Sequence, residues 1–316
     1  MQAHFVFSEA FPKKIFLQFL GILAVSLFTG LAEAKKINPI QEIFEPPQPE
    51  PAHQYSKVAV VQWAPGSAPL NVSKVEAEEF KQSNRETLEA YIREAVDHGA
   101  EWVVTPEFAV VGYPDLPGVP DEDDEFQTRE QLAPYVETIP GPTTKYFGAL
   151  ALELGVFLQV GFAEEDRRTG HYHNTVVAFD PSGSIVGIYR KINLYKGEKK
   201  ILKAGEELSI YKTPWGRVGM IICADVYSPF PLEDYYQEGV DILALSTSWA
   251  QANTGMTHFR RAARDMGVSL LAANQSYFPD SGVINSDGSL QSHIRQSVGI
   301  AYGYLKKRKN SSGPRR

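Results

Sequence analysis

Several short, almost wholly apolar runs are spread along the chain, and they constrain its fold more than any other feature. Residues 58–63, 102–105, 218–222 and 241–246 are rich in valine, isoleucine and other apolar residues, and polar or turn-forming residues follow each run. Runs of this length and composition are typical of buried strands. Because helical spacing separates the first two runs, we predict an α/β fold with parallel crossovers.

Helical spacing of apolar residues predicts the elements that join these strands. Helices are expected at residues 84–100, 143–154, 232–238 and 257–266. Further strands are expected at 156–162, 269–274, 282–285 and 298–302, with a hairpin formed by 174–180 and 184–190. Residues 112–130 are rich in proline and acidic side chains and are predicted to form a long loop, either a solvated excursion or a lid over a pocket.

Three chemically distinctive residues each lie where a predicted strand ends. Glu107 follows the strand at 102–105, Lys191 follows the hairpin, and Cys223 is the only cysteine in the chain. Open α/β sheets bind their ligands at the carboxyl ends of strands. Taken singly, each residue has an ordinary explanation, because a free cysteine is usually a small buried hydrophobe and a lone charge is usually solvated.

The sequences around these residues resemble the nitrilase superfamily of carbon–nitrogen hydrolases. Three blocks carry the resemblance: Thr-Pro-Glu-Phe at 105–108, Tyr-Arg-Lys-Ile-Asn-Leu at 189–194 and Gly-Met-Ile-Ile-Cys-Ala-Asp at 219–225. They occur in the order of the family's Glu-Lys-Cys triad, and the resemblance extends from Lys57 to about Tyr304. It implies a four-layer α-β-β-α sandwich, which often dimerises through its helices.

The resemblance also implies a role for each residue. Cys223 would be the nucleophile of a thioester mechanism, and Glu107 would take the thiol proton and pass it to the leaving amine. Lys191 would stabilise the oxyanion and, as a neighbouring cation, lower the pKa of the thiol. Glu198 corresponds to a second glutamate near the triad in many members and is expected to orient Lys191 or the substrate. Asn274 resembles a late Ala-Asn motif.

Departures from the family pattern bear on the substrate. True nitrilases carry Cys-Trp-Glu where this chain has Cys-Ala-Asp, which favours an amidase over a nitrilase. Ala224 replaces an aromatic residue, and Tyr227 stands where many relatives carry arginine. Tyr113, Ala224 and Trp249 are candidates to line the substrate pocket, with core packing as the alternative for the two aromatic side chains. A nitrilase and a catalytically silent binding protein are the alternative functions. Short motifs also resemble the secreted vanin and biotinidase branch.

The N-terminal region predicts export. Lys13 and Lys14 precede an apolar run at 15–31, and the small-x-small sequence Ala-Glu-Ala follows at 32–34. This pattern is typical of a secretory signal peptide, with an uncleaved membrane anchor as the alternative. We therefore expect a periplasmic or extracellular protein that contacts a membrane only if this segment is retained. The proline-rich residues 35–56 are predicted to be a stiff linker, with an arm packed along the domain as the alternative. The hydrolase domain is expected at 57–304 and a basic tail at 305–316.

The amino-acid composition narrows the functional classes that remain. The chain has 316 residues, of which 43% are apolar and 22% charged, as expected of a soluble globular protein. A net charge of −7 gives no reason to expect nucleic-acid binding. His171 and His173 are the only close pair of histidines and have no further ligand nearby, so no metal site or other cofactor is predicted. The expected partners are a small amide substrate and further copies of the chain, as a homodimer or higher homo-oligomer.

Overall fold

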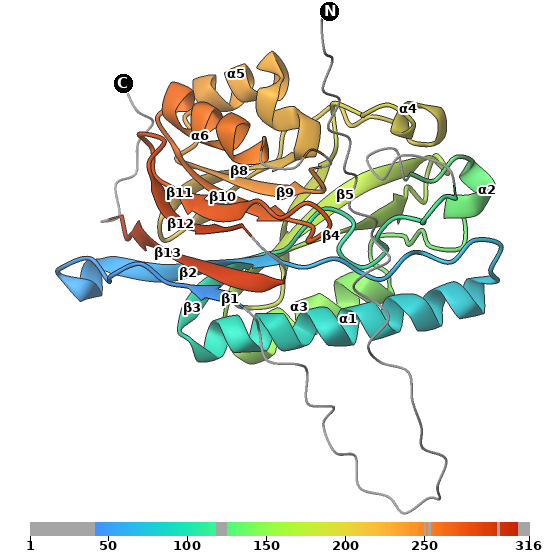
Figure 1. Cartoon of the computed structure of the whole chain (residues 1–316), viewed down its shortest axis with the longest axis horizontal. Coiled ribbons are helices and arrows are strands. Elements are labelled where there is room, and N and C mark those ends of the chain that lie inside the picture. Colours follow the sequence, from blue (N-terminus) through green and yellow to red (C-terminus); the bar gives the residue numbers. More distant parts are fainter. Residues whose placement is uncertain (1–41, 118–124, 250, 252–253, 296–297, 309–316) are drawn as a thin grey trace, which may run out of the picture. The chain divides into compact units, whose positions relative to one another are not determined.

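The structure is a computed structural model that describes residues 42–117, 125–249, 251, 254–295 and 298–308 (Figure 1). The predicted signal peptide, the first residues of the proline-rich segment, part of the 112–130 loop and the end of the basic tail lie outside these ranges. Within them, no helix is both long enough and apolar enough to cross a bilayer.

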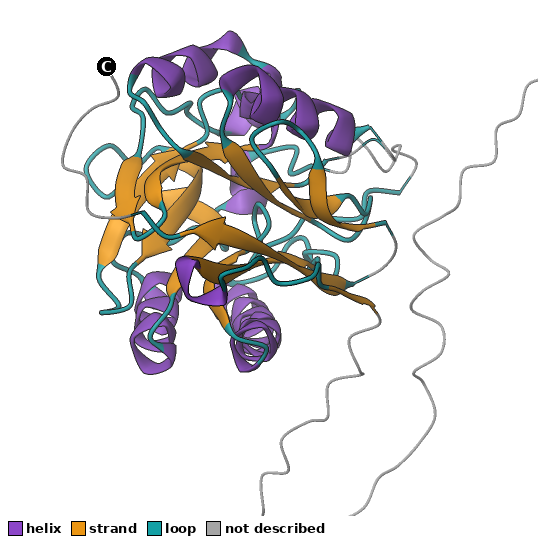
Figure 2. Ribbon diagram, turned by 90° about the vertical axis from the view of Figure 1, so that its left-hand side faces the viewer, coloured by secondary structure: helices purple, strands orange, loops and turns teal. Residues whose placement is uncertain are grey.

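Two mixed β-sheets face each other (Figures 1 and 2). In the described residues, one sheet has the strand order β1-β13-β2-β3-β4-β5-β6 and the other β12-β11-β10-β9-β8-β7. The first contains β1 (Glu42–Phe44), β2 (Tyr55–Gln62), β3 (Ala100–Val104), β4 (Phe157–Glu165), β5 (Tyr172–Phe179), β6 (Ile185–Arg190) and β13 (Gly299–Lys306). The second contains β7 (Ile210–Thr213), β8 (Gly216–Ile222), β9 (Ile242–Thr247), β10 (Ser269–Asn274), β11 (Ser281–Ile284) and β12 (Leu290–Ile294). Strands β2, β3 and β4 are parallel, as are β8, β9 and β10.

Helices cover the outer face of each sheet, which gives the expected four-layer α-β-β-α sandwich (Figure 2). Helices α1 (Lys74–Asp97) and α3 (Pro142–Leu154) pack on the first sheet, and α5 (Pro229–Gln237) and α6 (Gly255–Met266) on the second. Shorter elements are α2 (Arg129–Leu132), α4 (Glu198–Ile201) and the 3-10 turns η2 (Ala52–Gln54) and η4 (Cys223–Tyr227).

The central strands are apolar on both faces because each lies between two hydrophobic layers. In β2, Val58 and Val60 point between the sheets, whereas Ala59 and Val61 point toward α1 and α3. In β8, Met220 and Ile222 likewise face the other sheet, and the residue between them faces the α6 layer. Successive residues of a strand point to opposite faces, so burial on both sides produces the continuous apolar runs of the sequence.

Two stretches differ from the sequence-based expectation. Helix α1 begins at Lys74, well before residue 84, so the polar loop expected there is in part helical. A capping box starts the helix: the Ser73 hydroxyl accepts from the Glu76 N–H, and the Glu76 carboxylate accepts from the Ser73 N–H. The many exposed polar residues of the first turns concealed this helix from a search for apolar spacing. The short strands β7 and β12 were also missed.

The described part of the proline-rich segment packs along the domain. Strand β1 pairs in parallel with β13, and the Glu45 carboxylate forms an ion pair of 2.6 Å with Lys57 and accepts a hydrogen bond of 2.9 Å from the Tyr304 hydroxyl. From residue 42 onward the segment is therefore an arm on the sheet edge, which was the alternative to a linker.

Candidate active site

Glu107, Lys191 and Cys223 come together where β3, β6 and β8 end. The Lys191 Nζ lies 2.8 Å from Glu107 Oε1 and 2.7 Å from Glu198 Oε2. Cys223 is close enough that its sulfur, when ionised, raises the pKa of Lys191, so the thiol belongs to the same centre. Exposed fractions are 1% for Glu107, 2% for Lys191 and 4% for Glu198. The structure thus brings the three sequence-predicted triad residues and the second glutamate into one buried cluster.

The Glu107 carboxylate is held by donors from three elements. Its Oε1 accepts from Lys191 Nζ and from Asn174 Nδ2 at 2.6 Å, and its Oε2 accepts from the backbone N–H of Ser248 at 2.7 Å. The side-chain amide of Gln275 fixes the Glu107 backbone by donating to its carbonyl at 2.7 Å. Each contact to the carboxylate is a donor, which suits the ionised form and holds it in one orientation.

Asn174, on β5, is a site residue that the sequence analysis missed. Its Nδ2 donates to Glu107 Oε1 and, at 2.8 Å, to Glu198 Oε1. Glu198 is also fixed from the other side, because its Oε2 accepts from Lys191 and from the Tyr195 N–H at 2.8 Å. The available signal was a buried asparagine in an otherwise mostly apolar strand beside the one that carries Lys191.

Burial and charge determine how these groups titrate. Burial raises the pKa of Glu107, and Glu198 raises it further, while Lys191 acts in the opposite direction. Burial alone would lower the pKa of Lys191, but Glu107 and Glu198 outweigh it and hold that pKa well above its usual value. Lys191 therefore remains an ammonium ion, and Glu107 is a stronger base than a solvated glutamate.

Cys223 lies in a strained turn at the junction of β8 and η4. Its φ of 46° falls in the left-handed region, which is uncommon for a residue with a side chain. Asp225 holds this turn: its Oδ2 accepts from the Ile222 N–H at 3.0 Å and the Tyr189 hydroxyl at 2.8 Å. Its Oδ1 accepts from the backbone and side chain of Asn193 at 2.9 and 2.8 Å. Asp225 is a positioning residue that the sequence analysis did not assign.

The thiol of Cys223 is subject to opposing effects. Burial, followed by the charge of Glu107, raises the pKa of Cys223 to about 12, although Lys191 and the Thr247 hydroxyl lower it. Lys191 thus acts on the thiol pKa in the expected direction, but burial has the larger effect. At neutral pH the sulfur therefore carries its proton, and the Glu107 carboxylate at the same centre is a candidate to remove it.

The three pocket candidates lie in different surroundings. The ring of Tyr113 packs against that of Phe108, the residue after Glu107, with centroids 5.4 Å apart, and burial and then the charges of Glu107 and Glu198 raise the pKa of Tyr113 well above its usual value. Ala224 is 4% exposed and follows Cys223 in η4. Trp249 packs in the core: its ring centre lies 5.4 Å from that of Phe259, and its indole N–H donates to Thr254 at 2.8 Å.

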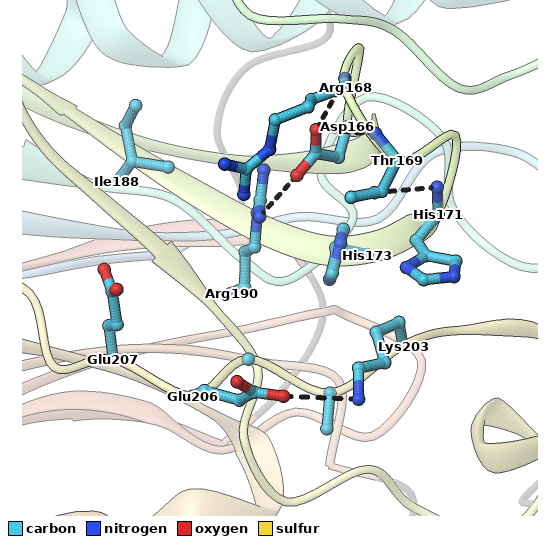
Figure 3. Close-up of a pocket in the computed structure, with 12 residues that line it drawn as sticks. Asp166, Arg168, Thr169, His171, His173, Ile188, Arg190, Lys203, Glu206 and Glu207 are labelled. Carbon is cyan, nitrogen blue, oxygen red and sulfur yellow. Dashed lines mark hydrogen bonds and ion pairs between the residues drawn. The ribbon is translucent and has the colours of Figure 1, made fainter.

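His171 and His173 lie in a separate pocket of about 380 Å³ (Figure 3). Arg190 and Lys203 also line it, and Arg190 is fixed there by an ion pair of 3.0 Å with Asp166. Because neighbouring residues of an extended chain point to opposite faces, Arg190 faces this pocket while Lys191 faces the triad. No group of three or more His, Cys, Asp or Glu side chains in the described part of the chain could hold a metal ion.

A four-layer sandwich that collects a carboxylate, an ammonium and a thiol at its strand ends has the architecture of the nitrilase-type hydrolases. The family model described as carbon-nitrogen hydrolase matches residues 57–290. The chain therefore belongs to the carbon–nitrogen hydrolase family.

Individual relatives agree with this membership. The bifunctional nitrilase/nitrile hydratase NIT4 of Oryza sativa subsp. japonica is 30% identical in an alignment of 227 positions, which covers 66% of this chain and 61% of that protein. The omega-amidase NIT2 of Homo sapiens is 27% identical in an alignment of 217 positions, which covers 66% of this chain and 71% of the human protein. The chain thus spans about three fifths of the length of the rice relative. The crystal structure of Saccharomyces cerevisiae Nit3, at 20% identity, shares the fold with a TM-score of 0.66 over 80% of this chain and 90% of the yeast chain.

Proposed function

We propose that the protein is a thiol amidase that cleaves a non-peptide C–N bond of a small amide and releases a carboxylic acid with ammonia or an amine. One observation carries this proposal: the Lys191 ammonium is bound at 2.8 and 2.7 Å by two carboxylates at a centre that also contains the cysteine. A base, an oxyanion stabiliser and a nucleophile are the parts that acyl transfer from an amide requires.

In the first half-reaction, the sulfur of Cys223 attacks the amide carbonyl carbon while its proton passes to Glu107. The carbonyl oxygen gains the electron pair, and the Lys191 ammonium stabilises the negative charge. Glu107 then donates its proton to the nitrogen, the C–N bond breaks, and the amine leaves a thioester on the sulfur. Because the thiol pKa is about 12, proton transfer and attack are coupled rather than successive.

In the second half-reaction, Glu107 removes a proton from water, which attacks the thioester carbon. The C–S bond breaks, the acid departs, and the sulfur regains a proton from Glu107. Glu198 remains bound to Lys191 and to Asn174 throughout, so we assign it the role of holding the ammonium in place. Asp225 and the turn it fixes keep the sulfur at the strand end.

The proposal is tested by trapping the thioester. The protein is incubated with butanamide and a pool of other small amides, quenched in acid and examined by intact-mass and peptide mass spectrometry. An acyl group on Cys223 together with released ammonia is the expected result, and Cys223→Ala is the matched control. Neither adduct nor ammonia from any amide would contradict the proposal and favour a catalytically silent binding protein.

Nitrile hydrolysis is the second candidate, because the rice relative is described as a nitrilase/nitrile hydratase. The residues after the nucleophile, Ala224 and Asp225, are the reason to place amides first. Butanenitrile and butanamide distinguish the two. Ammonia from the nitrile but not from the amide would replace the amidase proposal.

We also propose export of the protein and its assembly into homodimers. Export is supported by the sequence of residues 13–34. Mass spectrometry of the exported protein tests it, and a mature N-terminus just after residue 34 is the expected result.

Assembly is supported by Phe230 and Tyr236 of α5, which are 43% and 63% exposed. Light scattering that finds only monomers at micromolar concentration would contradict it.

A further inference from the structure

Glu125, on the loop that precedes α2, contacts the segment that carries Glu198. Its carboxylate accepts a hydrogen bond from the backbone N–H of Gly197. A β-carbon at position 197 would displace this carboxylate, so the glycine there leaves room for the contact. The loop and the segment before α4 are therefore fitted to each other at this point.

The Glu125 carboxylate faces the catalytic centre. The charged groups that act most on it are Glu198, Lys191 and Glu107, in that order. Glu125 in turn acts on the Tyr113 phenol. Glu125 is only partly buried, in contrast to Glu107 and Glu198, so a ligand can reach it.

The charges at this centre do not balance. Lys191 is already bound by Glu107 and Glu198, so its single positive charge is shared between two carboxylates before Glu125 is considered. Lys196 is exposed, and its Nζ lies 5.2 Å from the centre of the Tyr195 ring. A third carboxylate beside two others either takes up a proton, as the raised pKa of Glu125 reflects, or stays ionised where a cation accompanies it.

The described residues near the reacting groups include two aromatic side chains, Tyr227 and Trp249. Tyr227 is 48% exposed, and its ring packs edge-on against Trp249 with centroids 5.8 Å apart. After burial, the charges of Cys223 and Lys191 have the largest effects on its pKa, so its phenol lies near the reacting groups. The face of a tyrosine ring attracts cations, whereas the neutral phenol offers a substrate carboxylate a hydrogen-bond donor but no positive charge.

We propose that Glu125 binds a protonated amine of the substrate, and that the natural substrates are small amides bearing such a cationic group. This inference rests on the proposed amidase function. The surplus carboxylate provides the counter-ion, Gly197 sets its position, and the two aromatic side chains accommodate the cation. Glu125 is thus a specificity-determining residue.

The test compares amides of equal size and different charge. At pH 8, kcat/KM is measured for 4-aminobutanamide and 5-aminopentanamide and for their neutral isosteres pentanamide and hexanamide, with glutaramate as the anionic counterpart. N-(2-aminoethyl)butanamide and N-propylbutanamide repeat the comparison with the amine on the leaving group. The wild type is expected to prefer the cationic member of at least one pair by about tenfold or more, equivalent to about 1.4 kcal/mol.

In the variant Glu125→Gln, the ratio of kcat/KM for the cationic amide to kcat/KM for its neutral isostere is expected to be about one. Only this ratio is compared, because the absolute rates can change for other reasons. Glu130→Gln removes the same charge from an exposed position in the adjoining helix α2 and is expected to keep the wild-type ratio. A wild-type preference for the neutral or anionic amides, or an unchanged preference in Glu125→Gln, would overturn this inference and leave the amidase proposal standing. No turnover of any amide, with no acyl adduct on Cys223, would overturn both.

Discussion

Asn174 and Lys191 donate hydrogen bonds to the same two carboxylates, those of Glu107 and Glu198. The amide nitrogen of Asn174 lies 2.6 Å from Glu107 and 2.8 Å from Glu198, and the Lys191 ammonium lies 2.8 and 2.7 Å from the same pair. The lysine supplies charge, whereas the asparagine supplies donors without charge. The two residues therefore make separate contributions to the pKa of Glu107, and substitution can distinguish them.

Asn174→Ala is expected to raise the pKa of Glu107 further, because the lost donor stabilised the ionised carboxylate. The acid limb of the pH–rate profile should move to higher pH. Hydrogen bonds to charged groups contribute about 1.5–3 kcal/mol, so kcat should fall by roughly tenfold to a hundredfold. The profile of kcat against pH for wild type and variant is the measurement. A uniform loss of rate with an unmoved acid limb would mean that Asn174 acts only through packing.

Lys191→Ala is expected to abolish turnover and also to destabilise the fold. Removing the ammonium leaves Glu107 and Glu198 buried without a counter-ion, and breaking a buried pair in this way costs about 3–5 kcal/mol. The loss should be smaller at pH 5 than at pH 8, because the carboxylates become protonated. Urea denaturation at the two pH values measures this loss of stability.

Glu107→Gln is the comparison variant. It should also abolish turnover while retaining most of the stability, since no uncompensated anion is created. A stable, active Lys191→Ala would remove the lysine from the mechanism.

The sequence predicted most of the architecture because the apolar runs and the three motif blocks are local signals. The resemblance named Glu107, Lys191 and Cys223, and the structure brings them together. Asn174 was missed because its importance depends on which strand lies beside it. The high pKa of Cys223 could not be predicted for a related reason: the motif blocks indicate the lysine, which lowers that pKa as expected, but not the burial, which has the larger effect. Helix α1 was started too late because its capping box lies among exposed polar residues.

Alkylation should show that Cys223 is not a preformed thiolate. With a pKa of about 12 the thiolate is scarce at neutral pH, so reaction with iodoacetamide depends on proton removal by Glu107. The rate should still be rising at pH 10, above the ordinary thiol range, and Glu107→Gln should slow the reaction at pH 7 by about tenfold or more. The rate of mass gain at Cys223 between pH 6 and 10 is the measurement. A plateau below pH 8 would indicate a stabilised thiolate and contradict the coupled transfer.

Glu125 should make both stability and substrate binding depend on pH near neutrality. Burial, and then Glu198, raise its pKa from 4.5 to about 7. The folded protein therefore binds more protons than the unfolded chain between these values, so this group's contribution to stability falls as the pH rises from about 4.5 to 7. Glu125→Gln removes that dependence, and its Tm relative to wild type should be higher at pH 8 than at pH 5.

Substrate binding should depend on pH in the opposite direction for an amine-bearing amide, because ionised Glu125 attracts the ammonium. KM of the wild type should fall as the pH rises through 7, and KM of the variant should not. Calorimetry and steady-state kinetics across this range measure the two effects, and equal Tm differences at both pH values would show that Glu125 titrates as a solvated carboxylate.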